Sequence, residues 1–320
     1  GLRSEADMSV DLLCMGEPML EFSQLPPSPD GRRLYLEGFG GDTSNTAIAA
    51  ARQGARAGYI TAVGKDAGGD AFLELWQKEG VDTTTVIRRA NLPTAVYFVM
   101  RRGAGHEFLF YRAGSAAAAY RPADLPEEAI VRTRIFYTSG ISLAISASAA
   151  DAVFRAMEVA RGAGVAIAFD TNYRRSLWPV PRARAAIHAG AAQAKYVFAS
   201  QEDAEALTGL QDPDAILDFY RALGAEIVIL KQGSAGAILA TPETRIRIAP
   251  PKVSAVDSTG AGDVLSGAFL ARILAGDPAE AAARYAVAAA ALSTTGYGAV
   301  APIPREPAVR QAMKDQSSSR

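Results

Sequence analysis

Short apolar segments alternate with longer segments of helical character through the second half of the chain, and this alternation limits the folds that the chain can adopt. Parallel strands need crossover connections, which are usually helices. The rhythm therefore predicts an α/β fold in which a central, mostly parallel sheet carries helices on both faces. Ligands of such sheets bind at the carboxyl ends of the strands. The apolar runs that predict buried strands are residues 135–137, 165–169, 196–198 and 227–230.

The first half of the chain continues this sheet and adds a smaller one. Aromatic-rich residues 95–100 and 107–111 flank a glycine-containing turn, which predicts a β-hairpin. We expect this hairpin to join residues 33–37 in a small separate β-sheet. Further candidate strands are residues 10–16 and 58–64, and further candidate helices are residues 43–53 and 71–79.

The length of 320 residues suits one large α/β domain or two smaller ones. We expect one domain over residues 8–314, with the small sheet built from about residues 17–40 and 92–113. Residues 1–7 are polar and precede Met8, which we take as the natural start, and residues 315–320 are expected to be a flexible tail.

Composition excludes several classes of protein. Hydrophobic residues make up 49% of the chain and charged residues 21%, so a substantial core is available and disorder is not expected. The formal net charge of -1 gives no basic field for nucleic acid, and no apolar run is long enough to span a membrane. The single cysteine, Cys14, excludes a disulfide framework and is compatible with the cytoplasm, where we expect the protein. His106 and His188 lack the spacing of metal ligands.

Residues 257–263, Asp-Ser-Thr-Gly-Ala-Gly-Asp, are the segment most indicative of chemistry. The small residues predict a turn into a helix whose first backbone N–H groups face outward, and such a helix start attracts phosphate. A carboxylate there, on Asp263, is suited to taking a proton from a hydroxyl that attacks phosphate. A plain strand-to-helix turn with an Asp cap is the alternative reading of this segment alone.

Four further segments fall where this architecture brings ligand-binding residues together. Residues 38–45 contain glycines for close backbone approach, with Asp42 and Asn45 as partners for hydroxyls, although the same residues suit a simple helix cap. Asn172 and Arg174 follow a buried strand, and Arg174 suits an anion or a surface ion pair. Residues 200–203 offer carboxylates for hydrated Mg²⁺, or an ordinary acidic helix start. Residues 231–237 suit either a nucleotide-admitting turn or a hairpin.

Taken together, residues 40–45, 63–66 and 257–263 resemble the two signatures of the PfkB (ribokinase-like) carbohydrate kinases, in order and separation, over roughly residues 9–304. Within that family the chain is most similar to the 2-keto-3-deoxygluconate kinases. The residues that carry this closer similarity are 38–43, Leu92, Pro93 and Tyr97, Tyr111 and Arg112, 139–144, and 170–174 with Leu177 and Trp178.

The resemblance implies roles for individual residues, with the small sheet acting as a lid over the sugar. Asp263 is the expected catalytic base, and Gly260, Ala261 and Gly262 form the expected anion hole. Asp203 is expected to hold a metal through water. The expected sugar-binding residues are Gly41, Asp42, Asn45, Tyr97, Tyr111, Arg112, Arg174 and Asp263. The expected nucleotide-site residues are Asn172, Arg174, Ser200, Lys231, Gly233, Ser234, Gly236, Ala237, Gly260, Ala261 and Gly262.

Two departures from the family pattern bear on these roles. The segment that often reads Asn-x-x-Glu is Ser200-x-x-Asp203 here, which keeps the acid on a shorter arm. Phe110 stands where the gluconate-type kinases often have a tyrosine that contacts substrate, so one hydroxyl is lost. A missing hydrogen bond to substrate relaxes specificity.

We therefore expect ATP-dependent phosphorylation of the terminal hydroxyl of a sugar acid, 2-keto-3-deoxy-D-gluconate, to its 6-phosphate. Two guanidiniums converging on one site, from Arg112 and Arg174, are costly to desolvate without an anion between them, although nucleotide phosphates compete as the explanation for Arg174. The alternatives are a fructokinase, a ribokinase or another sugar kinase, and, more distantly, a non-catalytic sugar-binding regulator. No dinucleotide-binding glycine fingerprint or P-loop occurs.

The resemblance also implies cofactors and partners. ATP and Mg²⁺ are expected, with a monovalent cation such as K⁺ near residues 254–257. The partners are a small sugar acid and ATP, and not nucleic acid or membrane. We expect a homo-oligomer, specifically a dimer formed through the lid.

Overall fold

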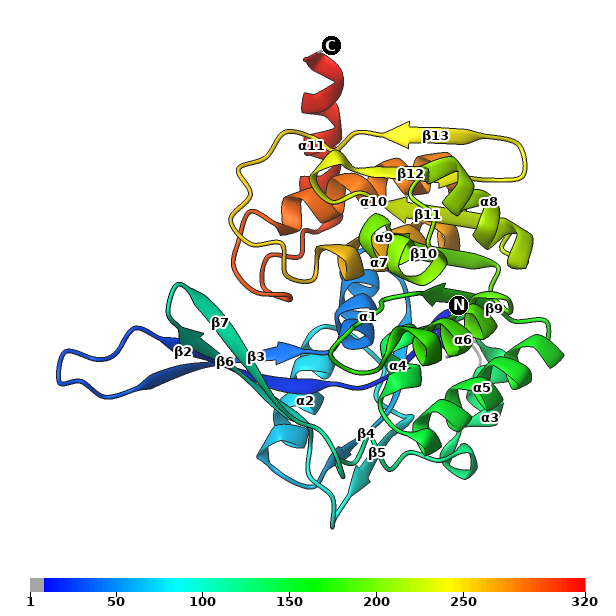
Figure 1. Ribbon diagram of the computed structural model, residues 1–320. Coiled ribbons are helices and arrows are strands. Elements are labelled where there is room, and N and C mark those ends of the chain that lie inside the picture. The colour runs from blue at the N-terminus through cyan, green and yellow to red at the C-terminus, as the bar shows by residue number, and fades with distance from the viewer. Residues whose placement is uncertain (1–8, 320) are drawn as a thin grey trace, which may run out of the picture.

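The main sheet of the computed structural model, which describes residues 9–319, has nine strands in the order β13-β12-β11-β10-β9-β8-β1-β4-β5 (Figure 1). The strands from β11 to β5 run parallel, whereas β12 and β13 add antiparallel pairs at one edge. The expected α/β fold with a mostly parallel sheet is confirmed. The strands are β1 (Leu12–Met15), β4 (Ala57–Gly64), β5 (Val86–Arg89), β8 (Ile135–Ser139), β9 (Ala166–Asp170), β10 (Tyr196–Ser200), β11 (Ile227–Lys231), β12 (Ala237–Ala240) and β13 (Arg245–Ile248).

Helices cover both faces of this sheet because successive strand residues point to opposite sides. In β1, Leu12 and Cys14 are buried in one core and Leu13 and Met15 in the other. The first core is covered by α1 (Asp42–Arg52), α2 (Ala67–Lys78), α9 (Ala261–Leu274), α10 (Ala279–Ser293) and α11 (Glu306–Ser318). The second is covered by α3 (Glu127–Arg132), α4 (Gly140–Ala144), α5 (Ala147–Gly162), α6 (Val180–Ala191), α7 (Gln201–Thr208) and α8 (Pro213–Leu223).

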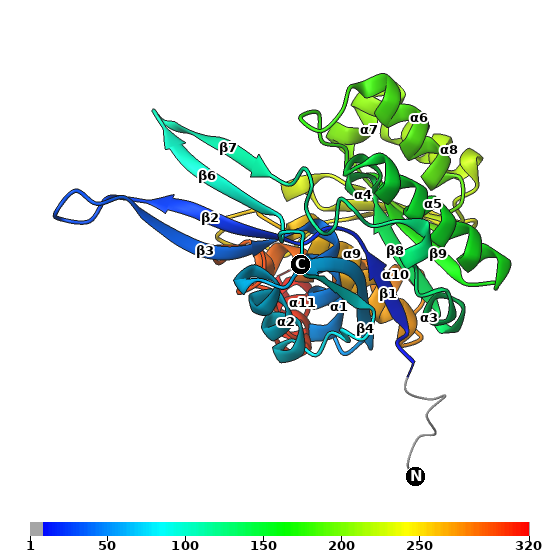
Figure 2. The ribbon, with the colours of Figure 1, turned by 90° about the horizontal axis from the view of Figure 1, so that it is seen from below.

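A second, four-stranded sheet projects from one side of the main body, as Figure 2 shows, and we call it the lid. Its strand order is β3-β2-β6-β7, and β2 pairs in parallel with β6 between two antiparallel pairs. The strands are β2 (Met19–Leu25), β3 (Leu34–Gly40), β6 (Val96–Arg102) and β7 (Gly105–Tyr111). The expected hairpin and its association with residues 33–37 are therefore present.

Helices α1 and α9 come unusually close to each other, and this contact positions the site. Gly267 of α9 lies against α1 such that a Cβ atom would sit 2.6 Å from the carbonyl oxygen of Thr46. Only glycine permits this approach. As a result, the first turn of α1 lies beside the first turn of α9.

Several elements differ from the expectation. Strand β3 continues beyond the expected residues 33–37 to Gly40, because residues 38–40 also pair with β2. Strand β5 was not expected, because its residues are only half-buried at the sheet edge and include two arginines. Helix α11 extends to Ser318, so the expected flexible tail is helical over most of its length. The expectations for residues 1–7 and Met8 lie outside the described residues. Within the described part of the chain, no helix has the length and apolar character to cross a membrane.

Candidate active site

The start of α9 is a tight turn held from both sides. Gly260 caps the helix in the left-handed region, with φ of 75°, and a Cβ atom there would lie 3.1 Å from that of Ala299. Asp257 fixes the preceding residues by accepting hydrogen bonds from the N–H (2.9 Å) and hydroxyl (2.6 Å) of Thr259, and from the N–H of Gly298 (2.9 Å). The turn is thus set by glycine geometry and one organising carboxylate.

Three backbone N–H groups at this helix start have no partner among the residues that the structure describes. The N–H of Ala261 donates to the carbonyl of Ser258 at 3.1 Å. The N–H groups of Gly260, Gly262 and Asp263 make no hydrogen bond anywhere within residues 9–319. Unpaired amides at a helix N-terminus, together with the helix dipole, form an anion-binding site. Of the expected anion-hole residues, Ala261 therefore contributes backbone shape but not a free donor.

Asp263 stands in the first turn of α9, next to these amides. Its carboxylate accepts a hydrogen bond of 3.1 Å from the side-chain amide of Asn45 on α1. Burial, followed by the charge of Asp42, raises the pKa of Asp263 to about 7, although the Asn45 amide and Lys231 lower it. A half-buried carboxylate with this proton affinity is suited to general base catalysis near neutral pH.

Asp42 and Asn172 connect α1 to the carboxyl end of β9. The Asn172 amide donates to the Asp42 carboxylate at 2.8 Å, and both side chains are buried. Asn172 adopts a positive φ of 26°, which is uncommon outside glycine and is supported by its N–H bond to Asp170 at 3.1 Å. Burial raises the pKa of Asp42. The residues singled out in three separate sequence segments thus meet in one place.

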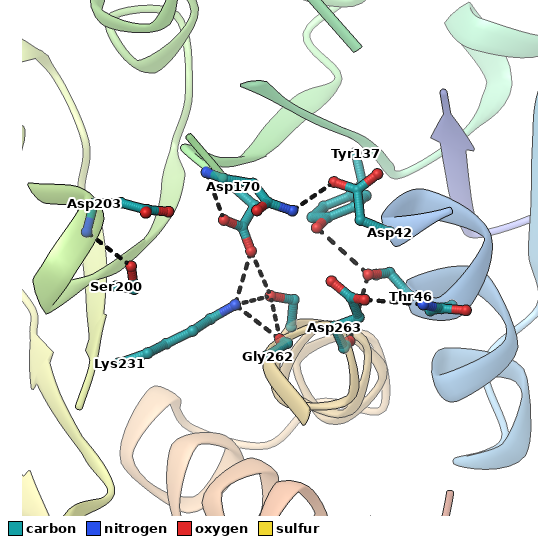
Figure 3. Close-up of polar contacts among 12 residues, drawn as sticks. Asp42, Thr46, Tyr137, Asp170, Ser200, Asp203, Lys231, Gly262 and Asp263 are labelled. Atoms are coloured by element: carbon teal, nitrogen blue, oxygen red, sulfur yellow. Dashed lines mark hydrogen bonds and ion pairs between the residues drawn. The ribbon is translucent and has the colours of Figure 1, made fainter. Parts of the chain in front are cut away.

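Lys231 ends β11 and points into this cluster (Figure 3). Its ammonium donates to the carboxylate of Asp170 at 2.7 Å, to the carbonyl of Gly262 at 2.8 Å and to the hydroxyl of Ser266 at 2.9 Å. The Lys231–Asp170 ion pair is largely buried. Lys231 was expected to line the nucleotide site; here its charge is engaged in joining β9 to the start of α9.

Asp203 lies at the start of α7, after β10. The hydroxyl of Ser200 caps the helix by accepting the Asp203 N–H at 3.1 Å, and the Asp203 carboxylate accepts the N–H of Tyr173 at 3.0 Å. Burial raises the pKa of Asp203 to about 6. The helix-start reading of this segment is confirmed, and the role of Asp203 in holding a metal stays a prediction.

Lid residues reach the site through a continuous row of contacts. The Tyr97 ring covers Gly40, where a Cβ atom would be 2.7 Å from it, and the Tyr97 hydroxyl donates to Glu21. Phe110 stacks on Tyr97 with ring centroids 5.5 Å apart, and the Arg112 guanidinium lies 5.4 Å from the Phe110 centroid. These side chains therefore lie on the lid face that leads to Gly41 and Asp42.

Some expected site residues are not brought into this cluster. Tyr111 is on the opposite face of the lid, edge-on to Phe98 and 62% exposed. Gly233 and Ser234 are exposed in a 3-10 turn (Gly233–Ala235), and Gly236 and Ala237 lead into β12, so residues 231–237 form the hairpin that was the alternative reading.

The same geometry can now be compared with known proteins. The chain matches the family model for pfkB family carbohydrate kinases over residues 12–306. The chain belongs to this family. The PfkB resemblance stated from the sequence is confirmed, and so is the kinase assignment at the level of a carbohydrate kinase.

The relatives of this PfkB kinase include both 2-dehydro-3-deoxygluconokinases and fructokinases. A 2-dehydro-3-deoxygluconokinase from Thermoproteus tenax is 32% identical over 312 residues, which cover 95% of each chain. Fructokinase-1 from Oryza sativa subsp. japonica is 34% identical over 320 residues, covering 95% of this chain and 97% of the rice protein. A crystal structure of a fructokinase with bound ATP from Xylella fastidiosa superimposes with a TM-score of 0.86 at 27% identity, covering 96% and 98% of the two chains. These identities are too similar to distinguish one sugar from another.

Sequence reasoning missed three residues that organise the site of this PfkB kinase. Asp170 and Ser266 receive Lys231, and Glu17 pairs with Arg112. Asp170 ends the buried strand β9 and Glu17 follows the buried strand β1, and this position at the carboxyl end of a strand is the signal that could have identified them.

Proposed function

We propose that the protein transfers the γ-phosphoryl group of ATP to the terminal hydroxyl of 2-keto-3-deoxy-D-gluconate, giving the 6-phosphate. The observation that carries the phosphoryl-transfer step is the Asp263 carboxylate beside three unpaired N–H groups at one helix start. A base and an anion site next to each other are what attack of an alcohol on phosphate requires.

In this mechanism, Asp263 accepts the hydroxyl proton as the sugar oxygen bonds to the γ-phosphorus, and the bond from that phosphorus to the β-phosphate oxygen breaks. The amides of Gly260, Gly262 and Asp263 hold the negative charge that develops on the phosphoryl oxygens. Asn45 keeps Asp263 oriented through its 3.1 Å hydrogen bond. The lid excludes water that would otherwise hydrolyse ATP.

The donor groups present fit Mg²⁺ that arrives with the nucleotide. Within residues 9–319, no group of three or more His, Cys, Asp or Glu could hold a metal ion alone. Mg²⁺ keeps several waters and binds through one or two carboxylates plus substrate phosphates, and Asp203 is the residue that would hold it through water. Bound Mg²⁺ would neutralise phosphate charge. A monovalent cation near residues 254–257 remains part of the proposal.

Two features support a sugar as the acceptor, and the first of them favours an acid. Arg174 follows Asn172 at the end of β9, is exposed, and makes no ion pair within the described residues, and its charge lowers the pKa of both Asp42 and Asp203. An exposed guanidinium without an ion-pair partner is available to an anion. The side-chain oxygen of Asn45 is buried without a partner among residues 9–319, so it is available to a sugar hydroxyl.

A neutral sugar such as fructose is the second candidate, and one observation favours it. Arg112, the other expected partner of the acid, is already paired with Glu17. A paired guanidinium retains hydrogen-bond donors but contributes little net charge.

A substrate panel tests the proposal. We expect kcat/KM for 2-keto-3-deoxy-D-gluconate to exceed that for fructose, ribose and gluconate, measured by ADP release coupled to a reporter reaction. A clear preference for fructose would replace the acid with the neutral sugar. Absence of ADP release with every sugar would favour the alternative that the protein is a non-catalytic sugar-binding regulator.

A further inference from the structure

The pair formed by Glu17 and Arg112 joins the core to the lid. Glu17 lies in the turn between β1 and β2, and its side chain is fully buried, while the Arg112 side chain follows β7 and is 13% exposed. Contact is bidentate, with Arg112 Nε 3.3 Å from Glu17 Oε2 and Nη2 donating to Oε1. A fork of this kind fixes the guanidinium plane.

This pair stands at the root of the lid. The chain leaves the core for the lid at Glu17, returns from β3 at Gly41, and returns from β7 at Arg112. Gly41, with φ of 102°, packs so tightly here that a Cβ atom would lie 2.4 Å from the carbonyl oxygen of Glu17. Glu17 is therefore fixed at the junction where the sugar-facing segments converge.

The other side of Arg112 faces a row of aromatic lid residues that includes Tyr97, an expected sugar-binding residue. Its guanidinium lies over Phe110, which stacks on Tyr97. The Arg112 guanidinium lies between Glu17 and the aromatic residues Phe110 and Tyr97. Its remaining N–H groups are directed toward the expected sugar site, while the Glu17 carboxylate neutralises its charge.

We propose that Glu17 is a specificity-determining residue, an internal counter-ion that sets how strongly Arg112 favours an acidic over a neutral sugar. With Glu17 charged, a substrate carboxylate must share Arg112 with a carboxylate already in place. A neutral sugar meets no such competition, because it needs only the remaining N–H donors. This inference rests on the proposed function in that Arg112 must face the acceptor sugar.

The environment of Glu17 supports this competition. Burial raises the pKa of Glu17, with Asp42 adding to the rise, although Arg112 lowers it. Arg112 is thus the partner that favours the charged form of Glu17, and it is the same guanidinium that a substrate carboxylate would have to share.

Replacing Glu17 with Gln tests the inference. The Glu17→Gln variant keeps the side-chain shape and removes the competing charge, so the ratio of kcat/KM for 2-keto-3-deoxy-D-gluconate to that for fructose should rise about tenfold or more. Glu107→Gln is the matched control, since it removes the same charge from an exposed ion pair with Arg102 on the same lid. That control should leave the ratio unchanged.

An equal effect of Glu17→Gln on both substrates would show a merely structural role and overturn the inference. Should Glu17→Gln fail to fold, judged by its melting curve, Glu17→Asp keeps the charge on a shorter arm and loosens the fork. A smaller rise in the same ratio is then expected, and an unchanged ratio counts against the inference.

The outcome is separable from that of the proposed function. If the native protein phosphorylates fructose and not the acid, the proposed substrate is wrong, yet the acid can still be assayed as an inhibitor of fructose phosphorylation. Glu17→Gln should then lower its inhibition constant about tenfold. An unchanged constant would overturn the inference.

Discussion

The side chains around the Asp263 carboxylate shift its pKa in opposite directions. Burial and the negative charge of Asp42 favour the protonated form, while Asn45 and Lys231 favour the ionised form, and the balance puts its pKa at about 7. A base is most effective when its pKa lies near the working pH. With Asp263 as the proposed base, we therefore expect the ionisation of this one side chain to govern turnover around neutrality.

Replacing Asp263 with Asn removes the proton acceptor and leaves the helix start in place. We expect kcat to fall by about 10²–10⁴-fold, with nucleotide affinity nearly intact, measured by ADP release and equilibrium binding. In the native protein, kcat should rise as the pH passes through about 7, because the base is ionised above its pKa. Near-normal turnover of Asp263→Asn would contradict the assigned role. So would a kcat of the native protein that decreases as the pH is raised through about 7.

Some site residues could be predicted from the sequence and others could not, for a physical reason. Asp263 and its neighbours could be predicted because a tight turn into a helix requires small residues in a local sequence pattern. Glu17 and Asp170 have no such pattern, and their partners are 95 and 61 residues away in the chain. Side-chain pairing across that separation depends on tertiary structure, which also decides that Tyr111 faces away from Tyr97.

Among the secondary-structure elements, β9, β11 and α9 are joined by one ammonium group. Lys231 of β11 reaches Asp170 of β9 and, on α9, the Gly262 carbonyl and the Ser266 hydroxyl (Figure 3). Strands β9 and β11 were predictable from their apolar runs, and the start of α9 was predictable from the small residues of the turn before it. The half-buried strand β5 was not, because an edge strand has little apolar signal.

Replacing Lys231 with Met should shift the acidic limb of the pH–rate profile to higher pH. Lys231 lowers the pKa of Asp263, so its loss raises that pKa, and more alkaline conditions are needed to ionise the base. Stability should also fall by about 3–5 kcal/mol, because Asp170 is left as a buried, unpaired charge.

Two variants control this experiment. Lys195→Met removes an equal charge from an exposed pair with Glu226 and should leave the profile in place. Lys231→Arg should restore much of the native profile. A profile that does not move in Lys231→Met would refute the electrostatic link.

At the scale of the whole molecule, the lid carries apolar side chains that the single chain leaves exposed. Leu36 is 61% and Phe108 56% exposed, and the strand register puts both on the same lid face as Tyr97. Apolar area of this kind is commonly covered by a partner. A second copy of the chain, lid against lid, is the partner that we expect.

Light scattering coupled to size exclusion tests this expectation. The protein should have twice the 33.5 kDa mass of one chain. The double variant Leu36→Glu/Phe108→Glu should be monomeric, since charges on the joined faces would be buried unpaired. Val131→Glu, an exposed apolar position on α3, is the matched control and should stay dimeric. A monomeric native protein would exclude the lid dimer.

The roots of the lid, at Glu17, Gly41 and Arg112, lie on different stretches of chain from the amide-bearing turn at residues 257–263. The proposed control of acceptor choice at Glu17 and Arg112 is therefore separate in sequence from the proposed phosphate site. Changes confined to the lid and its roots could redirect such an enzyme to a new sugar while its phosphate chemistry stays untouched. Enzymes that share this fold would in this way acquire new sugar substrates through a few substitutions at the root of the lid.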